Sequence, residues 1–396
     1  MLPNRLAKAA MSEHMADWDL TPGAELARLY EQWSLGGSGL LLTGNVMIDH
    51  VSREAARNVV LEDGVPLEPF RNWAEAGTAA GNHLWLQLNH PGRQTPRAIN
   101  RNPVGPSAAP AVRNFRMGRF GAPRALTDAE IIGIVARYAR AAELAREVGF
   151  TGVQIHGAHG YLIAQFLSPL TNLRTDRWGG PLLRRAEFAR QVVVAVRDRV
   201  GPDFPIAIKL NSADFQRGGF GEDDALAVMR LLAGAGIDLI EISGGTYETQ
   251  AMLGVESAER TRDREAYFLD FARTARRETT VPLMVTGGFR TATVMAQALA
   301  ERAVDVVGLG RPLAADPALS DKMLRGTSAG WVSPRGSKKS DPIAEGGFAM
   351  AQMFRMGRGL APDPTMGTFR ITRAILGRMM ADHLIYRARR RTVRHR

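Results

Sequence analysis

Residues 127–161 read TDAEIIGIVARYARAAELAREVGFTGVQIHGAHGY, a polar start followed by a long amphipathic run and a short apolar run. Thr127 and Glu130 have the spacing of a capping box, so a helix is predicted from here to a C-cap at Gly149. The run GVQIH at 152–156 predicts a buried strand. A helix joined directly to a strand is the repeating unit of an α/β fold.

The same alternation continues along the chain. Runs rich in leucine or β-branched residues predict strands at 5–11, 39–45, 83–88, 152–156, 206–211, 239–244, 282–287 and 306–310. Amphipathic patterns predict helices at 22–36, 66–81, 127–149, 181–200, 222–236, 264–279, 291–303 and 316–325. Eight such units in order predict a (β/α)8 TIM barrel. A doubly wound sheet shares this alternation, but no strand is followed by the G-x-G-x-x-G of a Rossmann nucleotide site.

Two segments depart from the simple unit. Residues 89–126 form a long loop after the third strand, rich in Pro, Gly and Arg, and such loops face the active site of a barrel. Residues 327–396 fall outside the barrel, which we assign to 1–326. They contain a linker-like stretch (330–347), a helical pattern (369–386) and an arginine-rich tail. This C-terminal extension can pack on a partner subunit, contact an acidic surface or be solvated, and we expect the solvated tail.

The composition excludes several classes of site. The chain has no cysteine, which excludes disulfides, thiolate zinc sites, iron–sulfur clusters and cysteine nucleophiles within it. The net charge of +11 would suit nucleic acid, but the tail YRARRRTVRHR holds much of the excess, so we expect no nucleic-acid partner. No apolar run reaches the roughly 18 residues of a membrane helix, and Lys8, Glu13 and Asp17 interrupt any signal peptide. A cytoplasmic location without membrane insertion is expected.

Glycines follow the last two predicted strands. The sequence TGGF contains Gly287 and Gly288, and GLGRP contains Gly310 and Arg311. The loops after strands 7 and 8 are the usual phosphate site of a barrel, where backbone N–H groups must be open to the ligand. Ordinary glycine turns could explain each motif alone, but the two together predict a phosphate site.

The fourth predicted strand ends in an unusual group of side chains. His156 ends the strand, and His159 and Tyr161 lie in the turn beyond it. Two imidazole N–H groups can donate to a single oxygen, and a tyrosine is protonated at neutral pH and can act as a general acid. The alternatives are histidines satisfied in the core and a metal site. No carboxylate or third histidine stands nearby in sequence, so no metal is expected.

Other strand ends carry polar side chains. Gln87 and Lys209 combine an amide with a fixed positive charge, which suits a flat heterocycle that becomes anionic on reduction. Either residue alone could be a structural polar group. Residues near the ends of the first and second strands join the candidate set: Met11, Ser12, His14 and Asn45.

These residues lie within familiar motifs. HGAHGYLIAQFLSPLTNLRTDRWGG (156–180) closely resembles the signature of the Old Yellow Enzyme family, the FMN-dependent ene-reductases, in its bacterial His–His form. LPNRLAKAAM, QLNHPGRQ, GPSAAP, PRALTDAEI and GLGRP resemble further motifs of that family in the expected order. The resemblance spans about residues 2–325.

The resemblance implies a role for each candidate. It implies FMN as cofactor, NAD(P)H as co-substrate and an α,β-unsaturated carbonyl compound (an enone) as substrate, reduced in a ping-pong cycle. His156 and His159 would hydrogen-bond the substrate carbonyl, Tyr161 would donate a proton, and His14 would face the substrate. The remaining candidates would bind the cofactor: Met11, Ser12, Asn45, Gln87, Lys209, Gly287, Gly288, Gly310 and Arg311.

Two other functions stay open. A flavin-dependent amine demethylase or dehydrogenase shares this barrel, but such relatives pass electrons to an iron–sulfur centre, which a chain without cysteine cannot bind. The dienoyl-CoA reductases are disfavoured for the same reason. A protein that retains FMN without turnover is the other alternative. A homo-oligomer is compatible with every reading.

Overall fold

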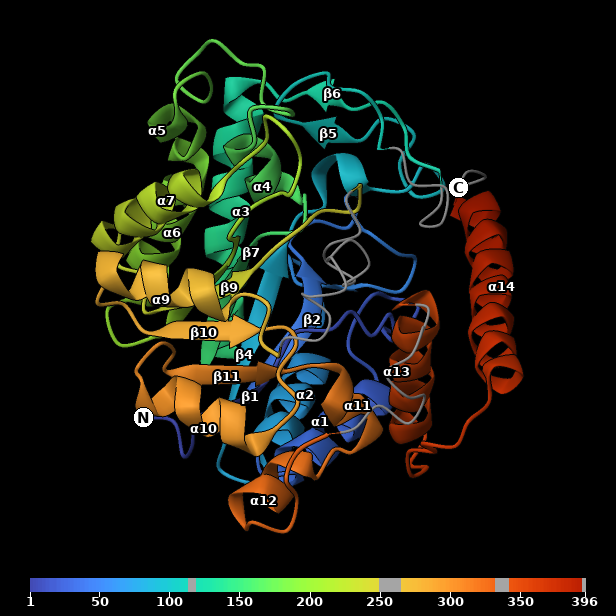
Figure 1. The fold of residues 1–396 in the computed structure, drawn as a ribbon. Helices are drawn as coiled ribbons and strands as arrows, with labels where there is room; N and C mark the ends of the chain where they lie inside the picture. Colours follow the sequence, from blue (N-terminus) through green and yellow to red (C-terminus); the bar gives the residue numbers. More distant parts are fainter. Residues whose placement is uncertain (113–118, 249–264, 332–341, 394–396) are drawn as a thin grey trace.

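Parallel strands close into a barrel in the computed structural model, which describes residues 1–112, 119–248, 265–331 and 342–393 (Figure 1). Each barrel strand pairs with the next, and β1 pairs with both β2 and β11 to close the ring. The barrel strands are β1 (Leu6–Lys8), β2 (Leu40–Met47), β4 (His83–Asn89), β7 (Gly152–Gly157), β8 (Ile206–Asn211), β9 (Leu239–Ser243), β10 (Leu283–Thr286) and β11 (Val306–Leu309). A strand lies at every predicted position, and the TIM barrel is confirmed.

Alternation along the strands sorts side chains between the barrel interior and the surrounding helices. Leu40, Trp85 and Leu239 belong to an inner apolar cluster, whereas Leu41 packs outward in the main core. Two residues after Trp85, on the same face of β4, Gln87 is paired in register with Gln154 of β7. The barrel interior is therefore apolar at its N-terminal end and polar at the C-terminal ends of the strands.

Helices surround the barrel (Figure 1). They are α1 (Ala24–Leu35), α2 (Glu68–Thr78), α3 (Asp128–Glu147), α6 (Glu187–Val200), α7 (Glu222–Gly234), α9 (Leu269–Glu278) and α10 (Ala292–Ala300), with the shorter α4 (Leu162–Leu167), α5 (Leu182–Arg185), α11 (Arg311–Ala315) and α12 (Leu319–Leu324). The capping box is present, because Thr127 accepts from the Glu130 N–H and Glu130 accepts from the Thr127 N–H. Val148, not Gly149, is the C-cap of α3, and Gly149 follows it with φ +98°.

The loops contain short elements of their own. After β2, β3 (Val59–Val60) adds to the end of the sheet. The long loop after β4 carries the 3-10 helix η1 (Gly92–Gln94) and the strand pair β5 (Val104–Gly105) and β6 (Arg124–Ala125). The predicted helix at 264–279 begins at a residue outside the described part of the chain, and α9 begins at Leu269. Within the described ranges, no helix combines the length and apolar character needed to cross a bilayer.

The C-terminal extension contains two helices, α13 (Pro342–Gly357) and α14 (Thr368–Val393). The helical pattern at 369–386 is confirmed, but the linker reading of 330–347 is wrong from Pro342 onward, where α13 begins. Helix α13 runs beside α1 and α11 (Figure 1), and Gln32 of α1 donates a hydrogen bond to the Met356 carbonyl at 2.9 Å. The glycine-rich composition of this segment disfavours a helix, but burial of apolar side chains such as Phe348 and Met353 stabilises α13 and outweighs this effect.

Helix α14 of the extension contacts other parts of the protein. Arg378 of α14 contacts Glu25 at 3.3 Å and lies over the Phe354 ring, so α14 packs on α13 and near α1. The side chains of the arginine tail, 386–396, lie outside the described part of the chain. The boundary between 1–326 and 327–396 stays a prediction.

Candidate active site

A cavity of about 440 Å³ opens at the C-terminal ends of the barrel strands. All of the predicted site residues except His14 line it: Met11, Ser12, Asn45, Gln87, His156, His159, Tyr161, Lys209, Gly287, Gly288, Gly310 and Arg311. They come from strands or loops far apart in sequence, which the barrel brings to one mouth. The chain therefore gathers the phosphate, heterocycle and histidine candidates around one space.

The histidine pair is held in defined orientations. The ring centroids of His156 and His159 are 5.1 Å apart, and the rings are inclined at 75°. The Ala158 N–H donates to His156 Nδ1 at 3.2 Å, which places the His156 proton on Nε2. His159 has φ +59°, and its Nε2 lies 2.8 Å from the Ser243 hydroxyl.

The two imidazoles are uncharged at neutral pH. Burial lowers the pKa of His156 well below its ordinary value, and the nearby His159 and Lys209 lower this pKa further. Burial, followed by the charge of Lys209, lowers the pKa of His159 in the same way. A neutral imidazole keeps one N–H, so each ring can donate one hydrogen bond to a ligand oxygen.

Tyr161 stands beside the pair, at the N-cap of α4. Its ring centroid is 4.7 Å from that of His156, and its hydroxyl is 2.7 Å from the Tyr247 hydroxyl. The hydroxyl donates to the Glu54 carboxylate and accepts from Asn45 Nδ2 at 3.2 Å. Burial and the charge of Glu54 raise the Tyr161 pKa well above 10, so the hydroxyl keeps its proton at neutral pH.

A buried polar chain supports the other side of the cavity. Gln87 Nε2 donates to Gln154 Oε1 at 2.6 Å, and Gln154 Nε2 donates to Glu241 Oε2 at 2.7 Å. Glu241 Oε1 accepts from Lys209 Nζ at 2.8 Å. The chain fixes Lys209 and directs the amide nitrogen of Gln87 away from a ligand, leaving its Oε1 as the acceptor. Buried charges need such complete pairing.

The glycine end of the cavity fits a phosphate. Gly287 has φ +130° and Gly288 has φ +83°, backbone conformations that other residues rarely adopt. A Cβ built on Gly288 would lie 2.8 Å from the Ala266 backbone nitrogen. Within the described residues, the buried Thr286 Oγ1 has no hydrogen-bond partner. Together with Arg311, this lining offers open N–H groups, a hydroxyl and a positive charge.

Sequence reasoning missed three parts of this region. Glu54 lies in the loop between β2 and α2, and Tyr247 lies in the loop after β9, so neither stands at a strand end. Helix α13 contributes Ala349, Met350 and Met353 to the cavity lining. Only the apolar spacing of 348–354 could have indicated a buried helix there.

His14 is not brought to the cavity. Its Nε2 instead lies 3.4 Å from Glu54 Oε1, and its side chain is 31% exposed. The residue has φ +53° and lines a separate small hollow, whereas Ser12 lines the cavity.

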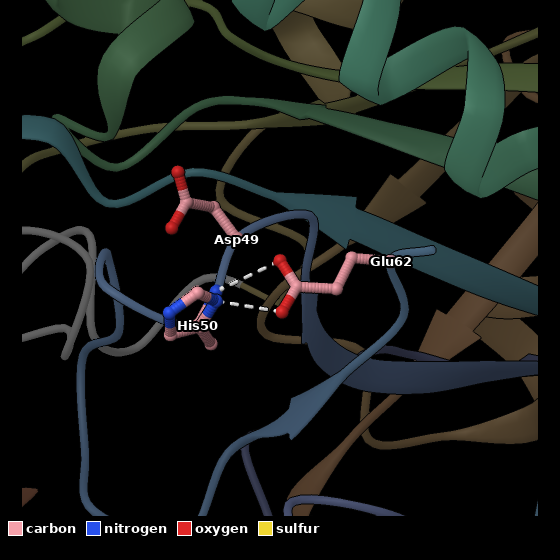
Figure 2. Close-up of side chains that lie close together, drawn as sticks. All are labelled: Asp49, His50 and Glu62. Carbon is pink, nitrogen blue, oxygen red and sulfur yellow. Dashed lines mark hydrogen bonds and ion pairs between the residues drawn. The ribbon is translucent and has the colours of Figure 1, made fainter. Parts of the chain in front are cut away.

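One further group of potential ligands lies outside the cavity. Asp49, His50 and Glu62 bring ligand atoms within 4.8 Å of one another (Figure 2). His50 Nδ1 is bound to Glu62 at 2.7 Å, and Asp49 already pairs with Arg137 at 3.0 Å. The charge of Asp49 is thus already paired with an arginine, and no metal is assigned to this group.

Comparison with known proteins shows which family this chain resembles. Residues 1–329 match the NADH:flavin oxidoreductase / NADH oxidase family. The chain is 37% identical to the NADH-dependent flavin oxidoreductase nadA of Aspergillus parasiticus, over 84% of this chain and 77% of that protein.

Two solved structures share the fold. An Old Yellow Enzyme homologue from Zymomonas mobilis aligns with a TM-score of 0.71 and 23% identity, over 87% of this chain and 94% of that one. Histamine dehydrogenase from Rhizobium sp. 4-9 aligns with a TM-score of 0.75 and 23% identity, over 94% of this chain and 51% of that one. At this identity each likeness shows the fold alone, and the chain spans about half of the histamine dehydrogenase.

The resemblance to the Old Yellow Enzyme family is confirmed, and with it the expected cofactor, because this family binds FMN and uses NADH or NADPH. The cavity fits FMN by its own chemistry. The glycine end offers N–H groups and Arg311 to a phosphate, and Gln87 and Lys209 offer an acceptor and a positive charge to a ring system. The buried Asn45 Oδ1, without a hydrogen-bond partner in the described chain, is a further polar atom at the cavity.

Proposed function

This chain belongs to the NADH:flavin oxidoreductase / NADH oxidase family, and we propose that it reduces the C=C bond of α,β-unsaturated carbonyl compounds with NAD(P)H. The observation that carries the proposal is the contact of two neutral imidazoles and one protonated tyrosine around a single cavity. An oxidase that passes electrons only to oxygen needs no such set of donors.

The chain would hold the cofactor from two ends. Gly287, Gly288, Gly310 and Arg311 would bind the phosphate, and Gln87 and Lys209 would bind the flavin ring, with Met11, Ser12 and Asn45 beside it. A bound FMN would supply hydride transfer between NAD(P)H and the second substrate. The positive charge of Lys209 would favour the reduced, anionic form of the cofactor, and the contact of Lys209 with Glu241 keeps that charge in place.

The histidine pair would polarise the substrate. His156 Nε2–H and an N–H of His159 donate to the carbonyl oxygen, which draws electron density from the conjugated alkene and makes its β-carbon electrophilic. For His159, the Ser243 hydroxyl can donate to Nε2, and the ring proton then lies on Nδ1. Preorganised donors of this kind stabilise the negative charge that develops on the oxygen.

Tyr161 would supply the proton to the α-carbon. Its hydroxyl lies in the cavity beside His156, so carbonyl binding and protonation take place in neighbouring positions. NAD(P)H and the enone would use the same cavity in turn. A ping-pong cycle of this kind needs no separate dinucleotide fingerprint.

Other roles have less support. The fold is shared with histamine dehydrogenase, but the absence of cysteine disfavours electron transfer to an iron–sulfur centre in this chain. A protein that retains FMN without turnover would need neither Tyr161 nor the histidine pair. A cytoplasmic location and a homo-oligomer stay predictions.

The experiment is an anaerobic titration of the purified holoprotein, followed by its flavin absorbance. NADH or NADPH should bleach the flavin band, and cyclohexenone should restore it. A flavin that is reduced by NAD(P)H but not reoxidised by any of a panel of enones would contradict the proposed substrate class.

Tyr161→Phe tests the proton donor separately. Loss of a general acid slows a proton-transfer step by about 10²–10⁴-fold, so reoxidation by cyclohexenone should slow on this scale. Reduction by NAD(P)H should keep its wild-type rate, because a hydride transfer to the flavin does not use this hydroxyl. Unchanged enone turnover in the variant would exclude Tyr161 as the acid.

A further inference from the structure

We propose that Glu54 and His14 form a path that returns a proton from solvent to Tyr161 after each turnover. The inference rests on the proposed enone reduction, in which Tyr161 gives its proton to the substrate. Neither Glu54 nor His14 lines the large cavity, and together they connect the Tyr161 hydroxyl to the protein surface.

Tyr161 needs a new proton because of its neighbour. Once the hydroxyl has lost its proton, a tyrosinate oxygen would lie in hydrogen-bond contact with the buried Glu54 carboxylate. Two anions in direct contact inside a protein are strongly disfavoured. The same burial and the same carboxylate raise the Tyr161 pKa well above 10, so a tyrosinate here draws a proton strongly.

The two oxygens of Glu54 accept hydrogen bonds from different sets of donors. Oε2 accepts from Tyr161, from Asn45 at 3.0 Å and from Tyr247 at 3.4 Å. Oε1 lies 3.4 Å from His14 Nε2 and accepts from Ser12 at 2.6 Å. The carboxylate therefore bridges the buried tyrosine and the imidazole.

Oε1 has one further donor, Asn58 at 3.3 Å. The Glu54 side chain is only 4% exposed, whereas that of His14 is 31% exposed. Of the described side chains bonded to this carboxylate, His14 alone combines solvent exposure with a ring that can both accept and donate a proton. A proton from water can reach Glu54 through this ring.

The other charged groups beside His14 already have ion-pair or hydrogen-bond partners. Glu13 and Arg57 line the same small hollow as His14. Glu13 pairs with Lys8 at 3.6 Å, and Arg57 donates to the Ala16 carbonyl at 2.7 Å and faces Asp382 at 3.5 Å. Glu54 is therefore the acidic partner of the His14 ring.

The proton balance closes over one cycle. Tyr161 loses one proton to the α-carbon of the substrate and regains one from Glu54 Oε2. Glu54 receives its proton at Oε1 from the imidazolium of His14, and rotation of the neutral carboxyl group exchanges its two oxygens and brings this proton to the Tyr161 side. His14 takes its own proton from water. Glu54 is an anion before and after, and no electron is moved. Burial raises the pKa of Glu54, but its hydrogen bonds and the charge of His14 outweigh this and lower the pKa to about 2, so the carboxyl passes a proton on and does not retain it.

The test compares a single turnover with many turnovers. Reduced holoenzyme is mixed with cyclohexenone alone for the first measurement, and with cyclohexenone and excess NAD(P)H for the second, and the product is quantified after quenching. In His14→Ala the first turnover should keep its wild-type rate, because Tyr161 still holds its resident proton. The steady rate should fall by about tenfold or more, the lower part of the range for assisted proton transfer.

Added imidazole should restore the steady rate of His14→Ala, because it can occupy the space of the missing ring and carry protons. His14→Gln keeps the volume and a hydrogen bond to Glu54 but cannot carry a proton, so it should be as slow as His14→Ala. His50→Ala is the matched control, because His50 is also an exposed histidine bound to a glutamate, at 2.7 Å from Glu62 (Figure 2). His50 is not part of the cavity lining. This variant should behave as wild type, with or without imidazole.

The outcomes separate the two proposals. Wild-type protein that cyclohexenone fails to reoxidise would overturn the proposed function and, with it, the proton path. Wild-type enone turnover combined with an undiminished steady rate in both His14 variants would overturn the path alone. A reduced rate in His14→Ala that imidazole leaves unchanged would also overturn it, because loss of packing alone would produce that result.

Discussion

Glu54→Gln removes the buried negative charge beside Tyr161 and keeps nearly the same side-chain shape. The carboxyl of Glu54 has a pKa of about 2 in the folded protein, against an ordinary value of 4.5. Burial opposes this shift, and the contacts with His14, Ser12 and Tyr161 produce it. A carboxyl whose pKa is lower in the folded than in the unfolded chain stabilises the fold above its unfolded pKa, and this stabilisation is lost as the pH falls through the folded pKa.

The size of the effect follows from the two pKa values. Each unit of difference corresponds to about 1.4 kcal/mol, so the ionised carboxylate contributes about 3 kcal/mol at pH 7. At pH 3 the unfolded chain is already protonated at this site and the folded chain is not, and the contribution falls to about 1 kcal/mol. The side chain is 4% exposed, so little of this is lost to solvent screening.

Urea unfolding of wild type and Glu54→Gln, at pH 7 and at pH 3 with a fixed excess of FMN, measures this contribution. The glutamine amide also directs an N–H group at the side chains that donate to Glu54 in the wild type. This lowers the unfolding free energy by an amount that does not depend on pH. The difference in unfolding free energy between the two proteins should therefore be larger at pH 7 than at pH 3 by about 2 kcal/mol. A difference that is the same at both pH values would refute the assignment of Glu54 as a strongly stabilised anion.

Three further changes test the cofactor end of the cavity. Gly288→Ala places a Cβ 2.8 Å from the Ala266 nitrogen, at a residue with φ +83°. Because the left-handed conformation alone costs about 1–2 kcal/mol, this variant should bind FMN about tenfold more weakly in a fluorescence titration. Glu241→Gln leaves the Lys209 charge uncompensated and should raise the reduction potential of bound FMN by about 30 mV or more, the equivalent of about 1.4 kcal/mol, in an anaerobic dye-linked titration. Ala349→Trp fills part of the cavity from α13 and should also weaken FMN binding about tenfold in the same fluorescence assay. A variant that binds FMN with wild-type affinity would contradict this expectation.

The barrel was predictable because each strand and helix has a local pattern. The capping box of Thr127 and Glu130 and the run at 152–156 depend only on neighbours in sequence. The site residues at strand ends were predictable for the same reason, because parallel barrel strands bring their C-terminal ends together. Gln87, His156 and Lys209 meet at the cavity through this rule alone.

His14 shows where that rule ends. Strand β1 stops at Lys8, so the alternation of side chains no longer applies six residues later. With φ +53°, His14 lies outside the cavity lining while Ser12 lies within it. A positive φ at a residue other than glycine depends on the surrounding tertiary contacts and cannot be predicted from the local sequence.

Glu54 and Glu241 could not be assigned to the site from sequence, because the groups that stabilise each buried carboxylate are distant along the chain. A buried carboxylate is stable only when donors surround it. For Glu241 these are Lys209 and Gln154, on two other strands, and for Glu54 they include Tyr161, which is more than a hundred residues away. In the sequence each glutamate looks like any surface acid. In the proposed mechanism the two carboxylates have opposite consequences for their partners: Glu241 would fix a cation that favours the reduced cofactor, whereas Glu54 would make the loss of the Tyr161 proton costly unless that proton is replaced. Of the two, Glu54 is therefore the one that would tie turnover to a supply of protons, and His14 is the exposed group in contact with it.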